Sequence, residues 1–342
     1  MNLMKNSNNK IRNYYPEIDF IKAFAIVSVV VLHILTFNGT KTSLYDSFAS
    51  YHIWQAVPLF MLIFGFTFRL SIEKKHSIGK IFSSRAIRLI IPLLVAYGIS
   101  FLPIFVFGIH PVIDWHIFIG VLPMHGMGNY FITLYIETII YFTIFYYVVK
   151  HFNKYLVILF SIFISVVGEL IAYSININDL YMYSSSVHRY TLLIALGYYF
   201  YDNINDKKNT FVLVLGGVSA VLLYMYNTSH YPIWPYNEYK SAVAWGFQHF
   251  PYAFYTVVFA LLLIHLYRLI NYTFFEKIII LIARSSFHIF LAQIFVFLIE
   301  KFYKINMNIL YAFLTLFVSL VAGIVWYKLE DMTLQWGSKN DD

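Results

Sequence analysis

The chain has 342 residues, of which 60% are hydrophobic and only 12% are charged. Soluble domains carry about 25% charged residues, so this composition excludes an ordinary water-soluble protein and indicates an all-α polytopic membrane protein. The formal net charge of +7 at pH 7 is typical of a membrane protein whose lysines and arginines gather on cytoplasmic loops, and no nucleic-acid partner is expected. The sequence contains no cysteine, which excludes disulfides, thiolate metal sites and an acyl-cysteine intermediate.

Apolar segments long enough to cross a ~30 Å hydrocarbon layer as helices follow one another along the chain. We expect ten spans, at 18–37, 53–71, 86–108, 128–149, 154–175, 187–203, 210–227, 246–267, 278–299 and 307–328. Residues 18–328 are therefore predicted to form one membrane domain between a cytoplasmic N-terminal segment, 1–17, and a cytoplasmic C-terminal tail, 329–342. No small-residue cleavage site follows the first span, so we interpret that span as retained.

The orientation follows from the distribution of lysine and arginine. With ten spans both termini lie on one side of the membrane. If that side is cytoplasmic, 17 lysines and arginines lie inside and 5 outside, and Lys22 and Arg69 lie near or within spans, which accounts for all 24. The positive-inside rule therefore predicts cytoplasmic termini in a multi-pass protein of the plasma (inner) membrane.

The first span contains a lysine and a histidine on one face. Lys22 and His33 are eleven residues apart, which is about 20° more than three full helical turns and about 16 Å along the axis. Ionisable groups at membrane depth are costly and by default indicate a functional site. The alternative is a hydrogen-bonded histidine in a packed bundle and a lysine that extends to the inner surface.

Arg85 and Arg88 lie three residues apart where the third span enters from the basic loop EKKHSIGK (73–80). Residues at this spacing are neighbours on a helix, and two guanidinium groups can each donate paired hydrogen bonds to phosphate. The alternative is topogenic charge beside a span.

Two carboxylates lie inside predicted spans. Glu137 is in the middle of the fourth span and Glu169 is near the outer end of the fifth. A carboxylate at such depth needs a partner or a proton. Either could orient His33 or bind hydroxyl groups of an acceptor; the alternative is a structural pair with a cation such as Arg69.

The outer loops are rich in aromatic residues, proline and histidine. His110, His116 and His125 have spacings of six and nine, which fit no compact zinc pattern, so no metal is expected. Trp234 and Tyr236 are candidates to stack on sugar rings, although such residues also form the aromatic belt of the membrane interface.

Five segments resemble, in order, the motifs of the membrane acyltransferase 3 family. The first segment has the family's basic residue, which is followed by ten residues and then a histidine. The third segment has the family's Arg-x-x-Arg motif, and the fourth resembles its glycine-rich start of a span. The segments are EIDFIKAFAIVSVVVLHI (17–34), VPLFMLIFGFTFRLS (57–71), SSRAIRLIIP (83–92), GMGNYFITLYIETIIYF (126–142) and IARSSFHIFLAQIFVF (282–297). In the last segment the family often has a histidine where this chain has Gln293, and a glycine where it has Ala283.

The resemblance implies a membrane-bound O-acyltransferase. Family members move an acyl group, usually acetyl, from cytoplasmic acyl-CoA to a sugar hydroxyl of a cell-envelope glycan. Acetyl-CoA is therefore the expected donor, and an envelope or extracellular polysaccharide, or its lipid-linked precursor, is the expected acceptor. The other partner is membrane lipid.

The resemblance also implies roles for particular residues. Arg85 and Arg88, aided by Lys74, would hold the CoA phosphates. The thioester would then reach His33, whose neutral form is favoured by burial and could act as general base on the acceptor hydroxyl. Direct transfer and an acyl-histidine intermediate both remain open.

Lys22 would guide the CoA or pair with Asp19, one turn earlier, and Asp19 is also a candidate contact of the acceptor. Glu137 is the candidate second catalytic residue, and Glu169 is a candidate for acceptor binding. Ser285, Ser286 and His288, near the inner half of the ninth span, are expected to line the donor path. Ser286 and His288 are two residues apart and point in different directions, so they form no nucleophile–base pair.

A different function is compatible with the same pattern. The family includes polysaccharide export proteins without demonstrated transfer chemistry, so a glycan exporter or flippase is the alternative hypothesis. A small-solute transporter is less expected, because the sequence shows no inverted repeat and no matching pair of broken helices.

Overall fold

The computed structural model describes residues 14–37, 49–74, 76–108, 115–123, 126–174, 185–203, 210–229, 250–269, 275–305 and 308–340. Within these residues every regular element is a helix, so the all-α prediction is confirmed for the described part of the chain. The elements are α1 (Pro16–Thr36), η3 (Ala49–Tyr51), η4 (Ile53–Gln55), α2 (Ala56–Glu73), α3 (Ile78–Ser100), α4 (Leu102–Phe107), η5 (Trp115–Ile119), α5 (Tyr130–His151), α6 (Lys154–Ser174), η6 (Val187–Tyr190), α8 (Thr191–Asn203), α9 (Thr210–Ser229), α10 (Ala253–Leu269), α11 (Glu276–Arg284), α12 (Ser286–Phe302) and α13 (Ile309–Asn340).

The described residues contain fewer full membrane spans than the ten predicted. Five helices are long and apolar enough to cross a membrane, or six if α11 and α12 together form one bent span. Val212–Met225 and Ala253–Leu269 are shorter apolar helices. α13 continues to Asn340, so part of the predicted C-terminal tail is helical. The count of ten spans and the side on which the termini lie remain predictions.

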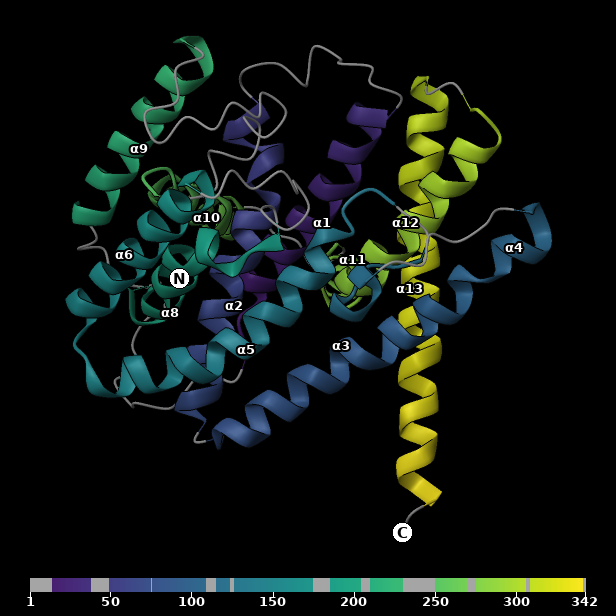
Figure 1. The fold of residues 1–342 in the computed structure, drawn as a ribbon, viewed down its shortest axis with the longest axis horizontal. Helices are drawn as coiled ribbons and strands as arrows, with labels where there is room; N and C mark the ends of the chain where they lie inside the picture. The colour runs from purple at the N-terminus through teal and green to yellow at the C-terminus, as the bar shows by residue number, and fades with distance from the viewer. Residues whose placement is uncertain are drawn as a thin grey trace.

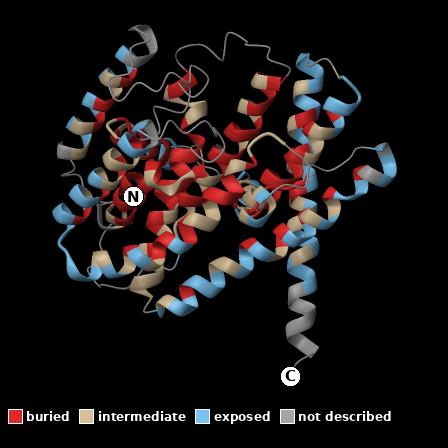
Figure 2. Ribbon diagram, viewed as in Figure 1, coloured by how far each residue is buried: buried red, intermediate tan, exposed pale blue. Residues whose placement is uncertain are grey.

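α1 and α2 lie in the middle of the bundle. Figure 2 shows buried residues concentrated there, whereas α3, α9 and α13 at the periphery are largely exposed. The exposed side chains of these outer helices are mostly large and apolar, as expected of a surface that faces lipid. The two helices that carry the first two sequence motifs are therefore covered by the others (Figure 1).

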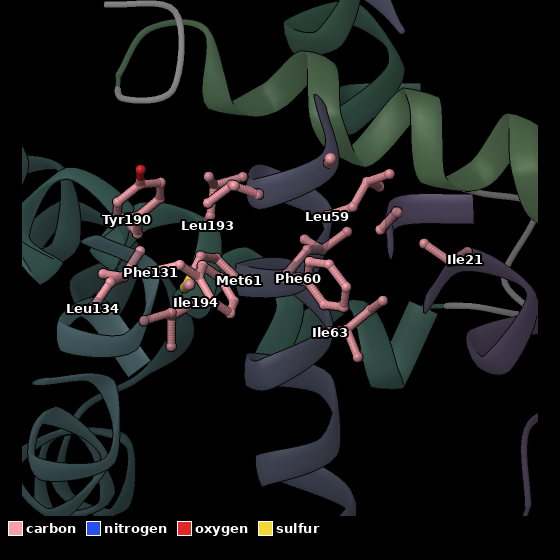
Figure 3. Close-up of a cluster of buried hydrophobic side chains, with 14 of the residues drawn as sticks. Ile21, Leu59, Phe60, Met61, Ile63, Phe131, Leu134, Tyr190, Leu193 and Ile194 are labelled. Atoms are coloured by element: carbon pink, nitrogen blue, oxygen red, sulfur yellow. The ribbon is translucent and has the colours of Figure 1, made fainter. Parts of the chain in front are cut away.

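Two glycines bring α2 and α8 into backbone contact. A Cβ atom on Gly65 would lie 2.0 Å from the carbonyl oxygen of Ile194, and one on Gly197 would lie 1.9 Å from that of Leu62. Small residues permit such close approach of helices in membranes. Around this contact Leu59, Met61, Leu193 and Ile194 pack with side chains of α1 and α5 (Figure 3). The contact fixes α2 as the central wall against which α1 packs.

The predicted span 278–299 is broken in the structure. α11 and α12 meet at Ser285 with a bend of 71°. The Ser285 hydroxyl donates a hydrogen bond to the carbonyl oxygen of Leu281 at 2.6 Å, a local bond of the kind that bends helices. The predicted span 278–299 therefore corresponds to two helices that pass for one membrane span only if they are taken together across this bend.

We predict that Gly65→Ala destabilises the protein. The added methyl group would meet backbone atoms that cannot rotate away, and such overpacking costs about 1–3 kcal/mol. The thermal unfolding temperature of the detergent-solubilised protein should therefore fall. Gly98→Ala is the matched control, since a Cβ atom there meets nothing within 4 Å, and alanine has the higher helix propensity. Equal unfolding temperatures for the two variants would contradict the close contact of α2 with α8.

Candidate functional site

A cavity of about 540 Å³ lies along one face of α1. Its walls come from α1, α2, the start of α5, the α11–α12 break and the C-terminal helix α13, with one side chain each from η4 and α3. Lys22 and His33 both line it. The eleven-residue spacing therefore predicted correctly that these two side chains share a face, and the structure places a cavity on that face.

His33 lies in the part of the cavity near the C-terminal end of α1 and is buried. Its Nδ1 lies 3.1 Å from Oε1 of Gln293 on α12. With the Gln293 amide in this orientation, its oxygen accepts a hydrogen bond from Nδ1–H, and Nε2 keeps its lone pair. Within the described residues no hydrogen-bond partner takes Nε2.

The start of α5 closes tightly around the imidazole. Gly128 has φ +87°, and a Cβ atom there would lie 2.9 Å from Cε1 of His33 and 3.0 Å from the ring of Phe290. The ring of Phe297 lies edge-on to His33 with centroids 6.0 Å apart. Glycine at 128 is thus required both by the backbone conformation and by the space that His33 occupies.

The other end of the cavity carries three cations, Lys22, Arg88 and Arg284, which we call the basic mouth. Arg88 and Arg284 are exposed, so this end is open. Lys22 Nζ lies 3.5 Å from Asp19, as expected for the pairing alternative, and Asp19 itself does not line the cavity. Sequence reasoning missed Arg284; the available signal was an arginine directly before the Ser285 break.

The structure separates the two arginines of the Arg-x-x-Arg motif. Arg85 does not line the cavity; its guanidinium donates to Thr67 Oγ1 at 3.1 Å and lies over the ring of Phe142 at 4.6 Å. Lys74, just after α2, does not line the cavity either. Of the three cations predicted to hold donor phosphates, Arg88 lines the cavity and Arg85 and Lys74 do not, so for Arg85 and Lys74 that role stays a prediction.

The two intramembrane carboxylates lie outside the cavity lining. Glu137 Oε2 accepts a hydrogen bond from the backbone N–H of Val187 at 2.8 Å. Glu169 Oε1 lies 3.5 Å from both Arg189 Nε and His188 Nε2. The sequence left open whether one of these carboxylates orients His33, and in the structure the ring nitrogen contacts Gln293.

The cation proposed as an alternative partner of these carboxylates is engaged elsewhere. Arg69 lies 2.7 Å from Glu73 and donates to the Tyr198 hydroxyl at 2.8 Å. The buried cation beside Glu169 is Arg189. We therefore carry neither Glu137 nor Glu169 into the functional proposal.

Parts of the predicted outer surface lie outside the described residues. These are Trp234 and Tyr236, with His110 and His125, so the sugar-stacking prediction stays a prediction. His116 stacks on Trp115 with ring centroids 4.0 Å apart. In the part of the chain that the structure describes, no group of three His, Asp or Glu side chains could hold a metal ion.

The fold and the cavity together define an integral-membrane helical protein with a buried histidine connected to a cluster of cations. The chain belongs to the acyltransferase 3 family, because the sequence profile described as "Acyltransferase domain" matches residues 15–328. This confirms the family suggested by the five motifs and makes acyl transfer the class of activity. No curated protein and no solved structure matches the chain.

We predict that Gly128→Ala disables the site without unfolding the protein. The methyl group would displace the His33 ring, and a misplacement of about 1 Å at a reacting group can cost about 10²-fold in rate. The measurement is acyl-transfer rate at matched amounts of folded protein. Gly108→Ala is the control, because Gly108 also has positive φ (+63°) but a Cβ atom there meets nothing within 4 Å. Equal losses in the two variants would show that backbone strain, not contact with His33, is responsible.

Proposed function

We propose that the protein transfers an acetyl group from acetyl-CoA to a hydroxyl of an envelope polysaccharide or its lipid-linked precursor. The observation that carries the proposal is that one cavity is lined both by the basic mouth and by His33. A donor with phosphates at one end and a thioester at the other requires such a pair of sites connected by a passage.

The donor would enter at the basic mouth. Lys22, Arg88 and Arg284 are suited to its phosphates, since guanidinium and ammonium groups form charge-assisted hydrogen bonds with phosphate oxygens. By the positive-inside distribution this is the cytoplasmic side, where acyl-CoA is available. Lys22 is about 16 Å from His33 along α1, and the pantetheine arm would extend over this distance.

His33 would act as the general base. Its Nε2 would take the proton from the acceptor hydroxyl as that oxygen attacks the thioester carbonyl. The tetrahedral intermediate then collapses, the carbon–sulfur bond breaks, and the thiolate leaves with the proton that His33 returns. Atoms and charge balance, and the products are the O-acetyl ester and CoA.

Gln293 supports this direct transfer. By accepting the Nδ1 hydrogen it holds the tautomer in which Nε2 is the base. In an acyl-histidine the ring would carry a positive charge, which a carboxylate beside Nδ1 would stabilise. Among the described residues Nδ1 instead contacts the neutral amide of Gln293. We therefore favour direct transfer over an acyl-histidine intermediate.

The acceptor would approach from the end of the cavity opposite the basic mouth. Trp54, which precedes α2, and Tyr130, at the start of α5, line the cavity, and aromatic side chains provide faces for the C–H side of a sugar ring. The acceptor's identity as an envelope glycan rests on the family resemblance.

We predict that His33→Ala and Arg88→Ala reduce activity in different ways. With acetyl-CoA and an acceptor glycan, His33→Ala should lower kcat by about 10²–10⁴-fold because the general base is lost. Arg88→Ala should mainly raise KM for acetyl-CoA, because a ground-state phosphate contact is lost. The measurement is CoA release by the purified protein in lipid nanodiscs.

Arg85→Ala is the control for Arg88→Ala, since Arg85 belongs to the same motif but does not line the cavity. Its KM should equal that of the unaltered protein. An equal rise in KM for both variants would contradict the separation of the two arginines. Two results together would instead identify an exporter. The wild-type protein would neither bind nor consume acetyl-CoA, and cells from which the gene has been removed would retain unmodified glycan inside.

A further inference from the structure

The cavity contains a second histidine, which is paired with a carboxylate. His288 Nε2 lies 3.1 Å from Oε2 of Glu330, and this contact joins the first turn of α12 to α13. Both side chains line the cavity. The rings of Trp326 and Tyr327 lie edge-on to His288, with centroids 5.8 and 5.4 Å away, and hold it in place. The transfer step described above uses neither member of this pair.

Close packing of α12 against α13 positions the carboxylate. A Cβ atom on Gly323 would lie 2.3 Å from Cα of Ile289, so the two backbones touch there. Glu330 follows Gly323 by seven residues, about two helical turns, and therefore projects from the same face of α13. That face is the one directed at α12 and the cavity.

The pair lies on the wall of the proposed donor path. Gln293, which contacts His33, follows His288 by five residues, a rise of about 7.5 Å along α12. Lys22, at the basic mouth, is about 16 Å from His33 along α1. The His288–Glu330 pair therefore lines the same cavity as His33 and the basic mouth, about 7.5 Å along α12 from Gln293.

One carboxylate oxygen of Glu330, Oε1, is available to accept a hydrogen bond from a ligand. The side-chain hydrogen bond of Glu330 to His288 uses Oε2, and among the described residues Oε1, on a side chain that lines the cavity, takes part in no hydrogen bond. A carboxylate would repel the phosphates of the donor. Because an ionised carboxylate can only accept hydrogen bonds, Glu330 is suited to an uncharged part of the ligand that presents N–H groups.

We infer that the His288–Glu330 pair binds an amide N–H of the pantetheine arm of the donor. The arm is the uncharged section between thioester and phosphates, and it carries two amide groups. Glu330 Oε1 accepts one amide hydrogen, while His288 holds the carboxylate in position through Oε2. The inference rests on the proposed function and assigns to the last helix a part in donor binding.

The test compares two donors, acetyl-CoA and S-acetylpantetheine, which lacks the nucleotide. Glu330→Gln should raise KM for both donors by about tenfold, because the amide oxygen stays on His288 Nε2 and the NH2 group that then faces the arm cannot accept a hydrogen bond. Arg88→Ala should raise KM for acetyl-CoA alone. Glu276→Gln is the matched control, because Glu276 on α11 does not line the cavity, and its KM values should not change.

A second measurement uses the wild-type protein and so does not depend on the folding of a variant. S-acetylpantetheine with methylated amide nitrogens cannot donate the hydrogen bond, so its KM should be about tenfold higher than that of unmodified S-acetylpantetheine. In Glu330→Gln the two KM values should be similar.

The outcomes separate this inference from the proposed function. Equal KM values for the methylated and unmodified donors in the wild-type protein would overturn the inference while leaving acyl transfer intact. A KM for S-acetylpantetheine that Glu330→Gln leaves unchanged would do the same. Wild-type protein that consumes neither donor would instead overturn the proposed function.

Discussion

The arrangement depends on one constraint: Lys22 and His33 share a buried face of a single apolar helix. Ionisable groups at such depth persist only where they face a cavity or a partner. Asp19 pairs with Lys22 at 3.5 Å, and Gln293 contacts His33 at 3.1 Å. The face of α1 between Lys22 and His33 lines the cavity. α2 supports α1 from behind, through the glycine contact that fixes α2 to α8.

Two local departures from regular helix complete the site. Gly128 allows the start of α5 to lie against the imidazole of His33. The 71° bend at Ser285 places Arg284 in the basic mouth and the first residues of α12 in the cavity wall. Because α12 then extends past His288 to Gln293, one helix contacts both the proposed donor path and the base. The bend lets Arg284 and His288 line the cavity while Gln293, further along α12, contacts His33.

The sequence predicted the features that helical periodicity encodes and missed those that depend on contacts between distant helices. Spacing alone placed Lys22 and His33 on one face, and ordered motifs indicated the family. No pattern within one segment could pair His33 with Gln293, because the two are 260 residues apart. Spacing also could not decide between Arg85, which is bonded to Thr67 and lies over Phe142, and Arg88, which is exposed and lines the cavity. Glu330 was assigned to the C-terminal tail because the last span was expected to end at 328, and only the polar residues Arg284, Ser285 and Ser286 mark the break between α11 and α12.

The most direct test asks whether the basic mouth connects to the surroundings of His33. The natural chain has no cysteine, so single-cysteine variants report without background. Leu32→Cys lies in the cavity wall beside His33, whereas Val31→Cys lines a separate apolar groove. A charged, membrane-impermeant thiol reagent applied from the side of the basic mouth should label Leu32→Cys, and CoA should slow that labelling but not labelling of Val31→Cys. Labelling of Leu32→Cys that CoA does not slow, or that occurs only from the opposite side, would contradict the account.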